Sequence, residues 1–153
     1  MQKYNVIIIG GGPGGGYSLA AILGKNGKKV ALFEQEFLGG TCVNWGCIPT
    51  KTILKSAKIK SYFDNAEKFG LNSDGKFDFK QIFQRAKNNS LKLQGAILET
   101  LKNSGVDFYN KKAKVTSNHT VLSENEEFFF EKLVIQQALN QEKLKLKVLK
   151  EQI

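Results

Sequence analysis

The chain has 153 residues, the size of one domain, and a formal net charge of +9 at pH 7. This charge does not favour nucleic-acid binding, because Arg85 is the only arginine and the lysines are spread along the chain without a dense basic block. We interpret the lysines as a solvated surface. No segment approaches the roughly 20 apolar residues of a membrane span, and Val6–Ile9 is too short for a secretory signal. We therefore expect a cytoplasmic protein that binds neither nucleic acid nor membrane.

The first part of the chain predicts a βαβ unit. Tyr4–Ile9 is a nearly continuous apolar run, which is typical of a strand buried on both faces. The glycine-rich segment GGGPGGG follows, and Tyr17–Leu23 predicts a helix that ends by Gly27. Lys29–Phe33 then predicts a second buried strand.

The glycines between the first strand and the helix indicate a dinucleotide site. Gly10, Gly12 and Gly15 are in G-x-G-x-x-G register, which serves a tight turn, close approach of a pyrophosphate, and packing of helix on strand. The helix N-terminus offers amides and partial positive charge to the phosphates. Glu34, at the end of the second strand, is placed to accept hydrogen bonds from a ribose. A flexible glycine loop without a ligand is the alternative, but it does not account for the strand, the helix and the acidic residue.

Both cysteines lie in Gly39–Lys51, GGTCVNWGCIPTK. Five residues of α-helix rise about 7.5 Å, and a disulfide needs its Cα atoms closer than about 7 Å. A bridge between Cys42 and Cys47 therefore requires a tightened or broken turn, which Gly46 permits. Strained, accessible disulfides are readily reduced, so we predict a redox pair over a structural one. We predict no metal site, because a zinc site usually needs four ligands and only His119 could add a third.

Two long helices are predicted next, with apolar residues at helical spacing. Gly70 is placed to end the first helix, Asp74-Gly75 marks a turn, and Asp78 is a predicted N-cap for the second helix. We interpret both apolar stripes as core packing. Their members are Ile53, Leu54, Ala57, Phe63, Ala66 and Phe69 in the first helix, and Phe79, Ile82, Phe83, Ala86, Ala96, Ile97 and Leu101 in the second.

After the second helix the apolar period changes towards two, which predicts strands. Asn118-His119 is a predicted turn, and a lone histidine in a turn is most simply exposed, so His119 receives no catalytic role. We place the domain at residues 1–135 and a divergent lysine-rich tail at residues 136–153. The predicted strands are Val106–Tyr109, Lys112–Thr116, Thr120–Leu122 and Glu127–Ile135.

The motif GGTCxNxGCxPxK, together with the βαβ unit before it, closely resembles the active-site signature of the flavin-dependent pyridine nucleotide–disulfide oxidoreductases. This family includes dihydrolipoamide dehydrogenase, glutathione reductase and mercuric reductase. The resemblance covers residues 3–135 and implies an α/β fold, a Rossmann-like FAD-binding domain with a parallel sheet, long helices and a small β-meander. Thr50 before Lys51, Ile48 and the continuation IPTKTILKSAK favour the dihydrolipoamide dehydrogenase branch.

The resemblance also implies roles for individual residues. Cys42 would be the interchange thiol facing the substrate disulfide, and Cys47 the thiol facing the flavin. Lys51 would lie beside the reactive edge of the isoalloxazine, and the backbone of Ala113 would contact the adenine. NAD as co-substrate, lipoyl groups of 2-oxoacid dehydrogenase complexes as partners, and a homodimer are implied as well. The implied FAD contacts are Gly10, Gly12, Gly15, Glu34, Gly40, Thr41, Cys42, Lys51 and Ala113.

The chain departs from the family pattern at three places. The family loop usually reads GxGPGGY, so Gly16 is an inserted residue, and we expect it to be absorbed as a bulge in the first helical turn. Trp45 replaces a small aliphatic residue. The strand ending at Ile135 leads in the family to an Ala-Thr-Gly-Ser turn near the flavin, whereas here Gln136-Gln137-Ala138 follow.

Members of the family have several hundred residues, with nicotinamide-binding, central and interface domains beyond the FAD-binding part. We therefore expect a truncated chain with a replaced tail. Two functional classes follow. The first is the FAD and disulfide part of a dihydrolipoamide dehydrogenase-like enzyme, and the second is a non-catalytic FAD-binding module or remnant.

Overall fold

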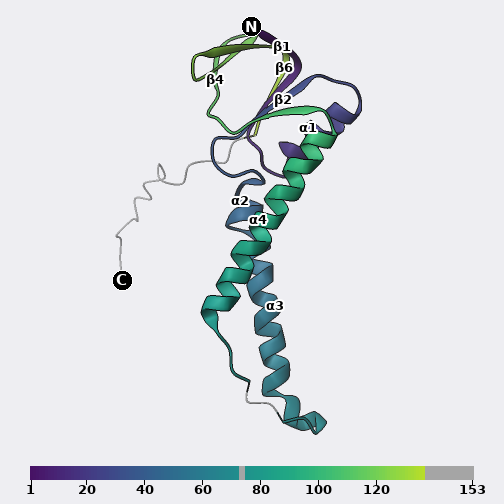
Figure 1. Cartoon of the computed structure of the whole chain (residues 1–153), viewed down its shortest axis with the longest axis vertical. Coiled ribbons are helices and arrows are strands. Elements are labelled where there is room, and N and C mark those ends of the chain that lie inside the picture. The colour runs from purple at the N-terminus through teal and green to yellow at the C-terminus, as the bar shows by residue number, and fades with distance from the viewer. Residues whose placement is uncertain (73–74, 137–153) are drawn as a thin grey trace, which may run out of the picture.

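The structure is a computed structural model, and it describes residues 1–72 and 75–136. A sheet forms one end of the described part, and two long helices extend from it side by side (Figure 1). The predicted tail and Asp74 lie outside the described residues. The elements in chain order are β1 (Gln2–Ile9), α1 (Tyr17–Lys25), β2 (Val30–Phe33), α2 (Gly40–Asn44), α3 (Cys47–Asp64), the 3₁₀ helix η1 (Ala66–Phe69), α4 (Phe79–Asn103), β3 (Val106–Tyr109), β4 (Lys114–Ser117), β5 (Thr120–Ser123) and β6 (Glu126–Ile135).

The strands form one six-stranded sheet in the order β3-β2-β1-β6-β5-β4. β1 pairs in parallel with β2 and with β6, β2 pairs in parallel with β3, and β4, β5 and β6 pair antiparallel. The predicted parallel sheet and small meander are therefore confirmed, and they are continuous with each other. The long strand β6 joins them, because its first half pairs with both β5 and β1 and its second half with β1 alone.

Each face of the sheet carries its own core. On one face, Ile8, Val30 and Leu32 pack with side chains from α1 and α4, including Ala20 and Leu101. On the other face the buried members all come from β-strands, and they are Tyr4, Ile7, Ile9, Ala31, Phe33, Val121, Phe128 and Phe130. Strands buried on both faces explain why β1 and β2 are nearly continuous apolar runs.

Helix α1 lies close to the chain that leads from α4 into β3. A Cβ atom placed on Gly24 would lie 2.2 Å from the carbonyl oxygen of Ser104 and 2.9 Å from Cγ2 of Val106. Only glycine fits this contact, because a backbone carbonyl has little room to move. The contact packs the C-terminal end of α1 against the chain that enters β3.

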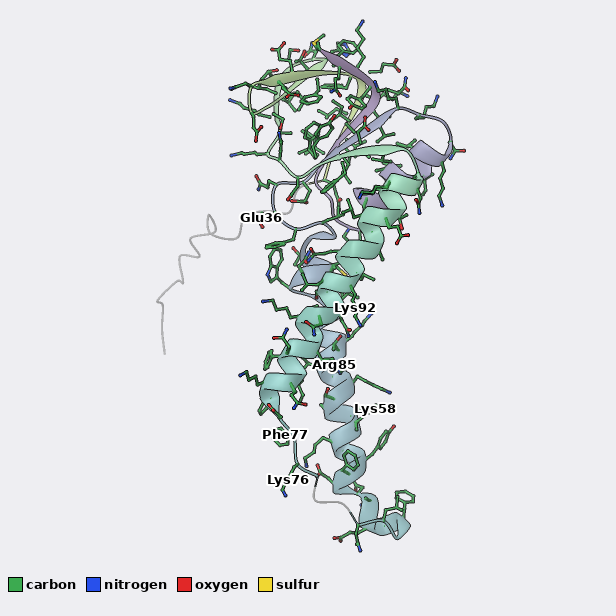
Figure 2. All side chains as sticks on the ribbon, in the orientation of Figure 1. Glu36, Lys58, Lys76, Phe77, Arg85 and Lys92 are labelled. Atoms are coloured by element: carbon green, nitrogen blue, oxygen red, sulfur yellow. The ribbon has the colours of Figure 1, made fainter. Side chains whose placement is uncertain are left out.

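Helices α3 and α4 form a hairpin that leaves the sheet, and much of it is held by polar contacts. Arg85 of α4 donates from Nη2 to the carbonyl oxygen of Thr52 at 2.5 Å and to Oγ of Ser56 at 2.9 Å. Figure 2 shows Arg85 and Lys58 along this hairpin, on its two helices. Asp78 caps α4 as predicted, because its side chain accepts from the backbone N–H groups of Lys80 and Gln81.

The interpretation of both apolar stripes as core packing is wrong for much of the hairpin. Ala66, Ala86, Ile97 and Leu101 are buried. Five other large members of the stripes are between 47% and 79% exposed, namely Leu54, Phe63, Phe69, Phe79 and Phe83. The reason is geometric: the hairpin projects beyond the sheet, so in the described part of the chain each helix packs mainly on the other. Among the described residues, no helix combines the length and hydropathy that crossing a membrane requires.

Gly24 in α1 and Gly95 in α4 allow the close contact of α1 to be tested by paired substitutions. Gly95, in α4, has nothing within 4 Å of a Cβ placed on it, whereas Gly24 in α1 faces the backbone at 2.2 Å. We expect G95A to raise the free energy of unfolding by about 0.5–1 kcal/mol, because alanine is the better helix former. We expect G24A to lower it by roughly 1–3 kcal/mol through overpacking. Urea unfolding of both variants measures the difference, and equal effects would contradict the described contact of α1.

Candidate functional site

A cleft of about 690 Å³ lies at the carboxyl ends of β1 and β2. In an open parallel sheet this edge, where the glycine loop and the acidic strand end meet, is the usual ligand site. Figure 2 shows Glu36, which belongs to the cleft, at the sheet end of the molecule and away from the far end of the hairpin. The cleft is lined by Ile9, Gly10, Gly12, Pro13, Gly14, Phe33, Glu34, Gln35, Glu36, Phe37, Gly40, Thr41, Cys42, Trp45, Lys111, Lys112, Ala113 and Gln136.

The loop after β1 turns sharply at Gly10. Its φ is +107°, which L side chains rarely adopt, and its N–H donates to the carbonyl oxygen of Phe33 at 2.8 Å. A Cβ on Gly10 would lie 1.8 Å from the carbonyl oxygen of Gln136. Glycine is therefore required at the first position of the motif, and the turn brings the loop over the sheet end.

The third glycine of the motif is not the one that the register predicts. Gly15 was assigned the close packing of helix on strand, but a Cβ there would meet nothing within 4 Å. A Cβ on Gly16 would lie 2.3 Å from the carbonyl oxygen of Gly10 and 2.6 Å from that of Gly12. Gly16 is buried and directly precedes the first residue of α1. The packing role therefore belongs to Gly16.

Glu34 joins the glycine loop to the loop after β2. Its Oε2 accepts from the N–H of Gly11 at 2.8 Å, and its Oε1 accepts from the N–H of Glu36 at 2.9 Å. A carboxylate offers about four lone-pair sites, so acceptor capacity is left for a hydroxyl of a ligand in the cleft. Sequence reasoning placed Glu34 at this edge but did not foresee these two backbone contacts.

The segment with the cysteines is docked onto the glycine loop by backbone atoms. Gly39 donates to the carbonyl oxygen of Gly11 at 2.9 Å, and a Cβ on Gly40 would lie 3.1 Å from Cα of Gly12. Gly39 and Gly40 both have positive φ, at 96° and 57°. This docking places Cys42, half-buried in α2, on the wall of the cleft.

The helix breaks between the two cysteines, at the position where the sequence allows it. α2 ends at Asn44 and α3 begins at Cys47, with Trp45 and Gly46 outside both helices. A Cβ on Gly46 would lie 3.1 Å from the carbonyl oxygen of Thr41, so glycine favours the close return of the chain here. Both cysteines are free thiols, and Cys47 is exposed at the N-terminus of α3.

The two thiols interact. The pKa of Cys42 is raised above its ordinary value, chiefly by a hydrogen bond with Cys47, then by partial burial and by the charge that Cys47 can carry. A backbone hydrogen bond at Cys47 and the positive charge of Lys51 act in the opposite direction and lower the pKa. Lys51 lies one turn after Cys47 in α3 and is exposed. The reduced pair therefore favours a protonated Cys42.

The cleft brings together most of the predicted site residues, but not all. Gly15, Cys47 and Lys51 do not line it, and they lie beside it in the turn before α1 and in α3. The predicted residues that line it are Gly10, Gly12, Glu34, Gly40, Thr41, Cys42 and Ala113.

Several lining residues were missed by the sequence reasoning. The Phe37 and Trp45 rings form an edge-to-face pair with centroids 5.4 Å apart. They come from irregular segments, where spacing carries no periodic signal. Gln136 was noted only as a departure from the family pattern, and that departure was the available signal.

His119 is exposed, and its Nδ1 is 3.1 Å from the carbonyl oxygen of Phe130 in the meander. Within the described residues, no cluster of three or more His, Cys, Asp or Glu side chains could hold a metal ion.

Comparison with known proteins decides the family. The sequence model described as pyridine nucleotide-disulphide oxidoreductase matches residues 4–138. The chain belongs to this family. It is 39% identical over 136 residues to a dihydrolipoyl dehydrogenase of Acholeplasma laidlawii, covering 88% of this chain and 40% of that protein. It is 44% identical over 114 residues to a dihydrolipoyl dehydrogenase of Chlorobaculum parvum, covering 74% of this chain and 22% of that protein.

The fold agrees with this family membership. The HOCl-induced flavoprotein disulfide reductase RclA of Escherichia coli, solved as a Cu(II) complex, superposes with a TM-score of 0.69 at 30% identity. The match covers 88% of this chain and 29% of that chain. The chain thus spans well under half the length of these relatives, and its similarity to the dihydrolipoyl dehydrogenases confirms the resemblance predicted from the cysteine motif.

The interaction between the thiols can be tested by alkylation of the reduced protein. Replacing Cys47 by alanine removes the largest cause of the raised pKa of Cys42, so we expect half-maximal labelling of Cys42 at a lower pH. Replacing Lys51 by methionine removes a charge that lowers the same pKa, so the half-point should move to higher pH. Iodoacetamide labelling over a pH series, followed by mass spectrometry of the Cys42 peptide, measures both. Shifts of the same sign in the two variants would contradict the described pair.

Proposed function

We propose that this chain binds FAD in the cleft and forms the FAD and disulfide part of a dihydrolipoyl dehydrogenase-like oxidoreductase. The observation that carries the proposal is that a single cleft is lined by the glycine loop, by Glu34 and by Cys42. Family membership and the dihydrolipoyl dehydrogenase relatives support it. The groups in the cleft also suit a dinucleotide. The glycine loop leads into the N-terminus of α1 and leaves room for a pyrophosphate, and the Glu34 carboxylate lies next to this loop.

The residues divide by the part of FAD that each would hold. Glu34 would accept from the ribose, and the backbone of Ala113 would contact the adenine. The glycine loop and the N-terminus of α1 would hold the pyrophosphate, with Gly16 in the packing role first given to Gly15. Gly40, Thr41 and Lys51 would contact the flavin part, beside the cysteines.

The cysteines would carry the thiol–disulfide exchange. With the pair oxidised, one thiolate of a dihydrolipoyl group attacks Sγ of Cys42, the Cys42–Cys47 bond breaks, and Cys47 leaves with the electron pair. The second dihydrolipoyl sulfur then attacks the mixed disulfide, closes the lipoyl disulfide and releases Cys42. The raised pKa of Cys42 lets this leaving thiolate take up a proton. Bound FAD would supply the two-electron acceptor that reoxidises the pair and passes the electrons on to NAD.

A second function rests on a different observation. The chain spans 40% and 22% of the two dihydrolipoyl dehydrogenases described above, so the 153-residue polypeptide also fits an FAD-binding module without turnover of its own. Only the first function implies NAD as co-substrate, the lipoyl groups of 2-oxoacid dehydrogenase complexes as partners, and a homodimer. Assay of the purified chain separates the two.

Flavin binding can be followed through Trp45, the only tryptophan, which lines the cleft. We expect FAD to quench its fluorescence, because the flavin would bind beside the indole. G16A should weaken FAD binding by at least about tenfold, since the added Cβ meets the Gly10 carbonyl, and G15A should weaken it less. W45F should lose the signal yet retain FAD binding by calorimetry. A folded wild-type chain that binds no FAD would refute the proposed function.

The order of the two thiols predicts a spectroscopic difference. After reconstitution with FAD and reduction by a dithiol, we expect a long-wavelength absorption band from a thiolate beside the flavin. Replacing Cys47 by serine should abolish the band, whereas replacing Cys42 by serine should keep it. The proposed FAD and disulfide part does not by itself include the NAD step, so we expect the same flavin-loaded 153-residue chain to show no NAD-dependent lipoamide turnover. Measurable turnover by the pure chain would contradict this expectation.

A further inference from the structure

The side chain of Gln136 lies against the glycine loop. Its backbone N–H donates to the carbonyl oxygen of Ile9 at 2.8 Å, which fixes Gln136 directly after β6 and beside the end of β1. A Cβ on Gly12 would lie 3.0 Å from Nε2 of Gln136, and a Cβ on Gly16 would lie 2.6 Å from its Oε1. The amide therefore occupies the space that the missing side chains of the loop leave open.

The side-chain oxygen of Gln136 accepts no hydrogen bond at its place beside the glycine loop. Oε1 of Gln136 is buried and has no hydrogen-bond partner, which makes it the exception among the buried side-chain polar atoms of the described residues. Buried acceptors of this kind almost always have a donor. Gln136 also lines the cleft, so its side chain lies in the cleft next to the loop with no donor on its oxygen.

The position of the amide conflicts with the chemistry of a phosphate site. A glycine loop binds a pyrophosphate because its backbone lets the anion come close and presents N–H donors. An acceptor oxygen at the same place carries a partial charge of the same sign as the phosphate oxygens. The bulk of the amide also covers Gly12 and Gly14, where a Cβ would lie 3.0 and 3.2 Å from Nε2.

We propose that the Gln136 side chain is a plug in the pyrophosphate part of the cleft, which a dinucleotide must displace before it binds. This inference rests on the proposed function, and it makes Gln136 the residue that sets the affinity of this chain for FAD and for its ADP half. The backbone of Gln136 is held by its hydrogen bond to Ile9, so a rotation of the side chain out of the loop leaves this contact intact.

Truncation of the side chain tests the plug. Calorimetric titration with ADP and with FAD should give about tenfold tighter binding for Q136A than for the wild-type chain, or ~1.4 kcal/mol. Q136L is the matched control, because leucine keeps most of the volume without the amide. It should bind within about twofold of the wild type. ADP reports on the glycine loop without any contribution from the flavin.

The outcomes separate this inference from the proposed function. Binding by Q136A that is equal to or weaker than that of the wild type overturns the plug, and weaker binding would make the amide a donor to the phosphates. Q136L as tight as Q136A overturns the plug as well, because the amide oxygen, and not the volume of the side chain, would then oppose the phosphates. If the wild type, Q136A and Q136S are all folded by circular dichroism and none binds ADP or FAD, the proposed function itself fails. Q136S removes most of the same side chain and replaces Q136A if that variant does not fold.

Discussion

Backbone contact between two glycine segments organises the site. The N–H of Gly39 reaches the carbonyl oxygen of Gly11 at 2.9 Å, and Cα of Gly12 lies within 3.1 Å of a Cβ placed on Gly40. A side chain on Gly40 would press against Gly12, so the close approach of α2 to the loop after β1 favours glycine at this position. Glu34 reinforces the arrangement by accepting from the loop and from the chain after β2. Through these contacts Cys42 lies in the same cleft as the glycine loop.

The path of the chain from the glycine loop to the thiol pair explains why both lie at one edge of the sheet. β1 and β2 are buried on both faces and hold the glycine loop and Glu34 at one edge of the sheet. The chain leaves β2, returns over this edge and starts α2 with two glycines of positive φ. The break at Gly46 then folds Cys47 back towards Cys42. The thiol pair is thus positioned by backbone geometry before any cofactor contact is considered.

The sequence predicted those parts of the fold whose signals are local. The βαβ unit, the break at Gly46, the cap at Asp78 and the meander follow from periodicity and from the properties of single residues. The exposed stripes of α3 and α4 were misread, because helical periodicity identifies an apolar face but not whether anything packs on it. The role of Gly15 was misplaced, because spacing alone cannot distinguish adjacent glycines, whereas the close approach to the Gly10 carbonyl can. The contact of Gln136 with the loop depends on the pairing of β6 with β1, which joins residues more than a hundred positions apart. The roles of the individual site residues stay predictions until ligand binding is measured.

The exposed phenylalanines of α3, η1 and α4 have a consequence for how the polypeptide behaves in solution. Phe63, Phe69, Phe79 and Phe83 face water on a chain whose net charge is +9. At low ionic strength like charges keep such molecules apart, and at about 1 M salt the screening length falls to about 3 Å, while the attraction between apolar rings persists. The colloidal solubility of this polypeptide should therefore fall as salt is added, which favours dilute buffers for its purification and storage.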